Sequence, residues 1–214
     1  MTPYTEHLLS VFMPQLLAGM GVNFKIAAIA LILGLALGVP LAIARLGGRF
    51  AGAGASLLLG LLRAAPTFVV MFFLFNVIAQ DAKVFGHAIA LSGVMTVALS
   101  LAPYATAYIA DNGVEALQQL RRGSPLAALL FLPNVARAFF VLVMSSSAGA
   151  AIGVSEGIAV ILREAERLPA SGDKFLLFAL GIACFGIALQ AGFALINLLK
   201  HRLGTLVARS NRSA

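Results

Sequence analysis

Glu156 is the side chain in this sequence with the clearest chemical potential. It follows a long apolar run, and a carboxylate in such a setting is costly unless it is solvated or paired. It could therefore bind the ammonium group of a cationic or zwitterionic substrate. The alternative is an interfacial residue whose side chain extends outward to water.

Three hydroxyls, Ser145 to Ser147, lie in the same apolar run. At about 100° per residue they face different sides of a helix, so all three cannot line one path. They could equally bond back to their own backbone, as serines in packed membrane helices do. Arg63 either anchors the topology or positions the second apolar segment against the path. The predicted substrate path consists of Glu156, Ser145, Ser146, Ser147, Arg63 and Thr67.

No residue pattern typical of an enzyme or a metal site is present. The three histidines lack metal-ligand spacing, and no nucleophile stands near a suitable base and acid. The nucleotide loop Gly-Lys-Ser/Thr is missing, so we expect no cofactor on this chain and no ATP bound by it. Asp111 and Glu115 share one helical face at i and i+4, beside an arginine-rich loop, which predicts solvated salt-bridge partners.

The elements that must hold these residues are membrane helices. Of 214 residues, 61% are hydrophobic and 11% are charged, against about 25% charged in soluble domains. A span needs roughly 20 apolar residues. The sequence predicts an all-α integral membrane protein with a single domain over 1–214. We expect a short interfacial helix at 1–15 and five spans, at about 19–46, 57–80, 88–110, 138–160 and 175–199.

Lysine and arginine in the short loops predict the orientation. Basic residues gather in the first turn, in the cytoplasmic segment 111–137 and in the tail, which places the N-terminus outside and the C-terminus in the cytoplasm. The net charge of +7 is explained by the same loops, so nucleic-acid binding is not expected. Within the first span, Gly34, Gly38 and Ala42 recur at every fourth residue. They are either a small-residue face for close helix packing or ordinary helix glycines.

Four stretches, in this order, resemble the permease subunit of ABC importers for polar amino acids, with the type I importer fold. They are GVNFKIAAIALILGLALGVPLAIARL (21–46), LLRAAPTFVVMFFLF (61–75), LAPYATAYIADNGVEAL (101–117) and IGVSEGIAVILREAERL (152–168). The resemblance covers most of the chain. It implies a transport subunit of the bacterial cytoplasmic (inner) membrane.

The same resemblance exposes a departure in the coupling loop, the part that docks on the ATPase in that family. The family pattern is Glu-Ala-Ala-x-x-x-Gly, followed by Leu-Pro. Either Glu115 begins a shifted remnant of it, or Gly113 to Leu117 is the piece before the motif and the motif is gone. In both cases the loop is shortened and degenerate. The predicted coupling residues are Glu115, Ala116, Leu117, Arg121, Arg122 and Gly123.

The partners that the resemblance implies are a second permease subunit, two ATP-binding cassette subunits that carry the ATP, a periplasmic or lipoprotein solute-binding protein, and membrane lipid. Because the loop is short, we expect a hetero-dimer in which the other permease carries the intact coupling helix. The alternative from another class is a scaffold or regulatory subunit that keeps the permease fold without transporting. A channel-like or exporter component is a third possibility.

Overall fold

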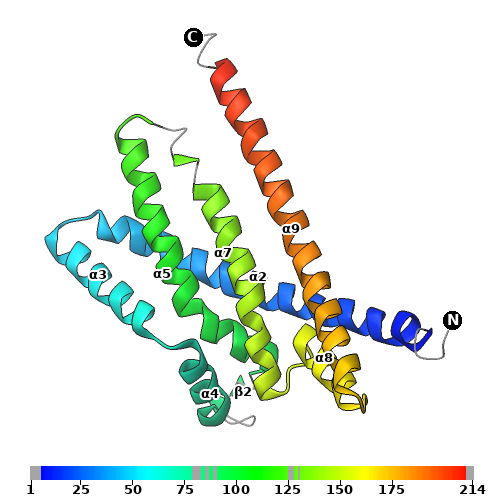
Figure 1. Ribbon diagram of the computed structural model, residues 1–214. Helices are drawn as coiled ribbons and strands as arrows, with labels where there is room; N and C mark the ends of the chain where they lie inside the picture. The colour runs from blue at the N-terminus through cyan, green and yellow to red at the C-terminus, as the bar shows by residue number, and fades with distance from the viewer. Residues whose placement is uncertain are drawn as a thin grey trace. The chain divides into compact units, whose positions relative to one another are not determined.

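The protein is mainly helical. Its computed structural model describes residues 6–78, 83–84, 87–88, 91–124, 128–129 and 131–210. A two-residue antiparallel ladder, β1 with β2, lies between α4 and α5. Parts of the expected 1–15 helix, of the loop after 78 and of the segment 111–137 lie outside the described residues. The elements are η1 (Leu8–Phe12), α2 (Met13–Arg45), α3 (Arg49–Ala64), α4 (Thr67–Val77), β1 (Lys83–Val84), β2 (His87–Ala88), α5 (Gly93–Arg121), α7 (Phe131–Ser145), η2 (Ser146–Ile152), α8 (Gly157–Glu166) and α9 (Ser171–Ser210) (Figure 1).

Four helical segments in the described residues are long and apolar enough to cross a membrane. They cover Leu8–Arg45, Gly93–Arg121, Phe131–Ile152 and Ser171–Arg202. The pair α3 and α4 gives a fifth if the two count as one broken span. This confirms the predicted class, an all-α membrane protein, and the four to five candidate spans agree with the expected number of about five. The orientation of the termini stays a prediction.

The expected second span, 57–80, is two helices rather than one. Helices α3 and α4 meet at 85° across a short break. Pro66 has no N–H to donate and its ring disfavours the helical conformation for Ala65. Both residues accordingly have extended backbones, with ψ of 111° at Ala65 and 121° at Pro66. The proline that the sequence placed at the entry of a span in fact separates two helices.

The N-terminal segment also differs from the expected separate helix over 1–15. Residues Leu8–Arg45 form one continuous helical segment, which opens with the π-helical turn η1. Pro14 is the second residue after that turn. In a regular α-helix the proline ring would clash with the carbonyl four residues earlier, and the wider π turn accommodates it.

The expected fourth span, 138–160, ends earlier than predicted. Helix α7 tightens into the 3-10 helix η2 and stops at Gly153, whose φ is +79°. The N–H of Gly153 bonds to the carbonyl of Ala150 at 3.1 Å, and that of Val154 to Gly149 at 3.0 Å. This pair of bonds is a Schellman motif, which favours glycine at the left-handed position. A new helix, α8, then starts after Glu156.

The described chain divides into two compact units. Unit 1 comprises 1–30, 66–101 and 142–187, and unit 2 comprises 31–65, 102–141 and 188–214. Helices α2, α5, α7 and α9 each contribute residues to both units. Each unit has its own close-packed contacts and its own polar cluster.

In unit 2, the glycine face of α2 packs directly on α5. A Cβ added at Gly34 would lie 2.6 Å from Ala105 Cβ, and one at Gly38 would lie 2.7 Å from the Thr106 carbonyl oxygen. Ala42 continues this face in a fully buried cluster with Leu59 and Ala110. The small-residue pattern therefore marks a packing face, because only glycine allows backbones to approach so closely.

In unit 1, the start of α8 is held tightly between two long helices. A Cβ added at Gly157 would lie 2.6 Å from the ring of Phe185 on α9, and one at Gly19 on α2 would lie 2.9 Å from the backbone of Glu156. The inner face of α8 is buried at Val160, Ile161 and Ala165. This packing fixes the position of the residue that precedes α8, Glu156.

Candidate functional site

Asn23 is the centre of a buried polar cluster in unit 1. Asn23, Ser146 and Glu156 are all 0% exposed. The Asn23 side-chain amide donates to Ser146 Oγ at 2.8 Å and to Glu156 Oε2 at 2.9 Å. Its own oxygen accepts from the Gly157 N–H at 3.0 Å. One side chain of α2 thereby links η2 to the start of α8.

Glu156 serves as the N-cap of α8. Its Oε2 accepts from the Ile158 N–H at 2.9 Å and its Oε1 from the Ala159 N–H at 2.8 Å. The first N–H groups of a helix lack intrahelical partners, and the helix dipole favours a negative charge at this end. With Asn23, three neutral donors satisfy this carboxylate, so the cost of burying it is offset by hydrogen bonds. The side chain does not extend to solvent.

The structure brings together only part of the predicted substrate path. Ser146 and Glu156 meet through Asn23, while Ser145 and Ser147 are half-buried and are not hydrogen-bonded partners of that cluster. Ser146 also donates to the Val143 carbonyl at 2.7 Å, the backbone bond expected of a serine in a packed helix. Thr67 is the first residue of α4 in unit 1, and Arg63 belongs to unit 2. Their contact with a substrate stays a prediction.

Asp111 on α5 binds two arginines in unit 2. Arg45, the last residue of α2, donates to Oδ1 at 2.7 Å. Arg63, in the last turn of α3, makes two hydrogen bonds to the same carboxylate. Its Nε donates to Oδ2 at 3.1 Å, and its Nη2 donates to Oδ1. The carboxylate is 39% exposed, which matches the prediction of a solvated salt-bridge partner. The two arginines come from helix ends, so this trio ties α2, α3 and α5 together.

The predicted coupling residues occupy the end of α5 and the turn that follows it. Leu117 packs against the small-residue cluster around Ala42, whereas Arg121 and Arg122 are exposed. Gly123 has a φ of +74° and closes a second Schellman motif. Its N–H donates to the Leu120 carbonyl at 3.0 Å, and the N–H of Ser124 donates to the Gln119 carbonyl at 2.9 Å. Gly123 therefore terminates the helix.

Little chain remains for a coupling element between α5 and α7. Residues 111–121 are the last turns of α5, and residues 131–137 are the first turns of α7. The connection is thus 122–130, of which 125–127 and 130 lie outside the described residues. Whether this connection contacts an ATPase stays a prediction.

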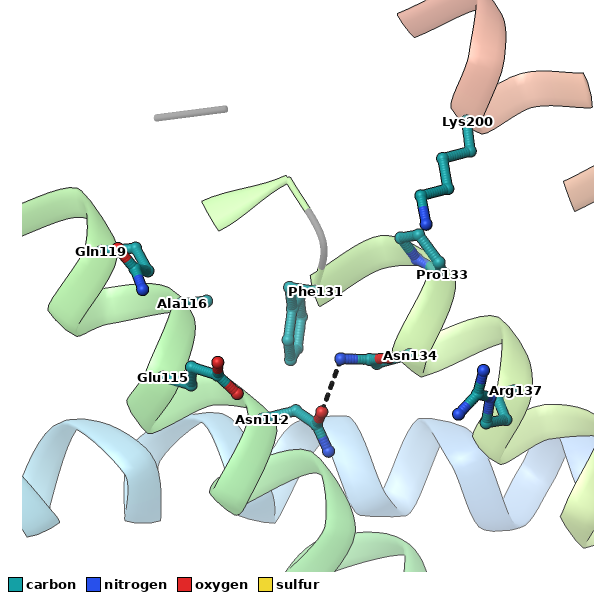
Figure 2. Close-up of a pocket in the computed structure, with 9 residues that line it drawn as sticks. All are labelled: Asn112, Glu115, Ala116, Gln119, Phe131, Pro133, Asn134, Arg137 and Lys200. Atoms are coloured by element: carbon teal, nitrogen blue, oxygen red, sulfur yellow. Dashed lines mark hydrogen bonds between the residues drawn. The ribbon is translucent and has the colours of Figure 1, made fainter. Parts of the chain in front are cut away.

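A polar pocket of about 250 Å³ lies next to this connection, within unit 2 (Figure 2). Its walls come from α5, α7 and α9, and Asn134 on α7 donates to Asn112 Oδ1 on α5 at 2.7 Å across it. The predicted coupling residues Glu115 and Ala116 are part of its lining. The pocket is lined by Asn112, Glu115, Ala116, Gln119, Phe131, Pro133, Asn134, Arg137 and Lys200.

Sequence reasoning missed three of these partnerships. Asn23 had no predicted role, although a carboxamide within apolar sequence is a signal that could have paired it with Glu156. The partners of Asp111 were expected in the adjacent loop but are Arg45 and Arg63. No pattern in the sequence near Lys200 indicated that its side chain would line the pocket.

Among the described residues, no group of three or more histidine, cysteine, aspartate or glutamate side chains could hold a metal ion.

Known proteins resemble this chain in fold. No protein-family model and no curated protein matches the sequence. One solved structure, described as a crystal structure of an amino acid ABC transporter with histidines, is similar with a TM-score of 0.67 at 18% sequence identity. The similarity covers 91% of this chain and 96% of that one. The chain therefore shares the fold of a chain in that structure over almost its whole length.

Proposed function

We propose that this chain is a membrane-spanning permease subunit of an ABC importer for an amino acid or a similar small polar solute. The proposal rests on the similarity in fold to a chain of an amino acid ABC transporter. That similarity covers more than nine-tenths of both chains. The four sequence stretches that resemble such permeases support it. So does the number of apolar helices, four to five.

The proposed subunit works with partners. A second permease, two ATP-binding cassette subunits and a periplasmic or lipoprotein solute-binding protein complete the importer in the bacterial inner membrane. Closure of the ATPases rocks the two permeases between outward-open and inward-open states. Because only residues 122–130 connect α5 to α7, the other permease supplies the larger coupling helix.

The Asp111 cluster suits the transmission of that movement. A displacement at the end of α5 is passed through Asp111 to Arg45 and Arg63, and so to α2 and α3. Partly exposed ion pairs contribute only about 1 kcal/mol or less each. Such pairs therefore guide the helix ends without locking them.

Reconstitution with the partners tests the proposal. The chain is co-expressed with a candidate ATPase, second permease and binding protein from the same organism, and uptake of labelled amino acids is measured in proteoliposomes together with ATP hydrolysis. We expect substrate-stimulated uptake that needs all the subunits. Replacing both Arg121 and Arg122 by glutamine should lower ATP-coupled uptake, whereas the control Lys174→Gln, in the first turn of α9, should not.

Two outcomes would overturn parts of this assignment. Absence of uptake in the complete, correctly assembled complex would contradict the permease role. Full substrate-stimulated ATP turnover by this chain with the ATPase, without the second permease, would contradict the hetero-dimer.

A second candidate is a scaffold or regulatory subunit that keeps the permease fold. The short connection 122–130 favours it. The Glu156 carboxylate favours it too, because it accepts hydrogen bonds from three donors of the protein itself. This candidate predicts a stable complex in which uptake depends on the partner permease alone. Removal of this chain would then change ATPase regulation but leave solute selectivity unchanged.

A further inference from the structure

The Asp111 cluster of unit 2, which consists of Asp111, Arg45 and Arg63, has an excess of positive charge. Among the described residues, Asp111 is the only carboxylate within ion-pair distance of either arginine. Two guanidinium groups facing one carboxylate leave one positive charge uncompensated. Neither α2 nor α3, the helices that carry the arginines, contains an aspartate or a glutamate that could balance it.

Both guanidinium groups keep hydrogen-bond donors that Asp111 does not use. Arg45 donates one hydrogen bond to the carboxylate and Arg63 donates two, whereas each guanidinium presents a whole fork of N–H groups. The side chains of Arg45 and Arg63 are 34% and 44% exposed, so an anion can reach the remaining donors from outside. The planar fork matches the oxygens of a phosphate group, which it binds bidentately.

The cluster lies where apolar helices end. Arg45 is the last residue of the candidate span Leu8–Arg45. In the candidate span Gly93–Arg121, roughly 20 residues suffice to cross the hydrocarbon core, so Asp111 lies near the surface where α5 leaves the membrane. At that depth the phosphates of the bilayer are the anions nearest to the two arginines.

The face of α3 beside Arg63 is apolar and open. A Cβ added at Gly60, one turn before Arg63, would meet nothing within 4 Å. At about 100° per residue, Leu57 and Leu61 follow Gly60 around the helix, and their side chains are 69% and 62% exposed. An acyl chain can lie along this face while its phosphate meets the arginines. A soluble anion would gain nothing from these leucines.

We propose that the Asp111 cluster is a binding site for one anionic phospholipid of the surrounding bilayer, with the phosphate on Arg45 and Arg63 and an acyl chain along the exposed face of α3. The phosphate competes with the Asp111 carboxylate for the same donors, so the bound lipid loosens the tie between α5 and the ends of α2 and α3. Zwitterionic lipids bind more weakly, because their own ammonium group balances the phosphate. The site concerns lipid binding and does not depend on whether the chain transports.

Titration of the purified chain in an uncharged detergent tests this site. The probe is dioctanoyl phosphatidylglycerol, its zwitterionic control is dioctanoyl phosphatidylcholine, and microscale thermophoresis measures both affinities. We expect phosphatidylglycerol to bind at least about fivefold more tightly than phosphatidylcholine, a difference that added salt should reduce. A rise in melting temperature with phosphatidylglycerol concentration should accompany binding. Equal affinity for the two lipids would overturn the proposal.

Substitutions in the cluster should change the affinity for phosphatidylglycerol in opposite directions. Arg45→Gln and Arg63→Gln should each weaken binding about fivefold, because each removes one cation from the phosphate. Asp111→Asn should strengthen binding, because the phosphate then has no carboxylate to compete with. Arg63→Lys keeps the charge and should bind more tightly than Arg63→Gln. Weaker binding by Asp111→Asn as well would indicate a purely structural cluster and overturn the proposal.

The matched control is Arg122→Gln, which removes an exposed cation from the turn after α5 and leaves the cluster intact. This variant should bind phosphatidylglycerol like the wild type. A fivefold loss here too would indicate diffuse attraction between a basic protein and an anionic lipid, and would overturn the assignment to the cluster.

Two other occupants of the cluster are tested directly. Inorganic phosphate that displaces the lipid at equal concentration would assign the arginines to a soluble anion and overturn the proposal. In the assembled complex, native mass spectrometry should detect phosphatidylglycerol with the wild-type chain and less of it with Arg63→Gln, and equal amounts would assign the arginines to a partner subunit instead. Uptake by the complete transporter is measured separately, so failure of this site leaves the proposed transport function standing, and the reverse also holds.

Discussion

Replacement of Glu156 by alanine should destabilise unit 1 strongly. The change removes the N-cap of α8 and leaves the Ile158 and Ala159 N–H groups, and one donor of Asn23, without an acceptor. Loss of a cap costs about 1 kcal/mol, and each unsatisfied buried donor costs about 1–3 kcal/mol. Because these terms overlap, we expect a total loss of about 3–5 kcal/mol.

The glutamine variant should be milder. Its carbonyl oxygen keeps part of the cap, and the neutral amide avoids the desolvation cost of a buried carboxylate. One N–H group, however, then faces the amide NH2, which cannot accept its bond. We expect Glu156→Gln to lose about 1–2 kcal/mol, which places it between the wild type and alanine.

Thermal unfolding in detergent, followed by circular dichroism, measures this series. For a chain of this length, 1 kcal/mol shifts the melting temperature by roughly 2–4 °C, so Glu156→Ala should melt about 10 °C below the wild type. Glu166→Gln is the control, because that exposed residue of α8 makes no such bonds. In a double-mutant cycle, Asn23→Ala and Glu156→Ala should lose less together than the sum of the singles.

A wild-type melting temperature for Glu156→Ala would refute the capping argument. Equal effects of the alanine variant and the Glu166 control would do so as well. A glutamine variant of normal stability that abolishes uptake would instead assign Glu156 to the substrate, as the sequence suggested.

Three further predictions concern unit 2. Gly38→Leu should lower the melting temperature by forcing α2 away from the Thr106 carbonyl, whereas Gly60→Leu should not, because a Cβ added at Gly60 would meet nothing within 4 Å. Asp111→Asn should weaken the ties to its two arginines by about 1 kcal/mol or less, an effect that shrinks at high salt; an undiminished effect would contradict an electrostatic origin. Gly123→Ala should cost about 1–2 kcal/mol because the left-handed φ is strained for alanine, and Gly123→Asn should cost less. Limited proteolysis at the end of α5 measures both, and the alanine variant should be cleaved faster.

Local patterns predicted much of the helical framework. Apolar runs of sufficient length predicted the class of helical membrane protein, and the spacing of Gly34, Gly38 and Ala42 marked a real packing face. Pro66 and Gly153 were visible in the sequence, but their effects were underestimated. Proline at a span entry and glycine late in a span each end a helix here, because one lacks an N–H and the other adopts a positive φ.

The sites were less predictable than the framework. Glu156 was identified from its burial cost alone, but its partner Asn23 is 133 residues away and no local pattern connects the two. The same holds for Asp111, whose arginines lie 66 and 48 residues earlier. Its partners were expected in the nearby loop because sequence reasoning favours neighbours.

By itself, the sequence determined that this protein is a helical membrane protein, because hydrophobicity and length are properties of each segment alone. It also determined which polar residues are too costly to bury without a partner. Only the tertiary structure decided which partners they have, since hydrogen bonds between distant segments depend on how the helices pack. That packing makes Glu156 a helix cap and gathers Glu115, Arg137 and Lys200 around one pocket.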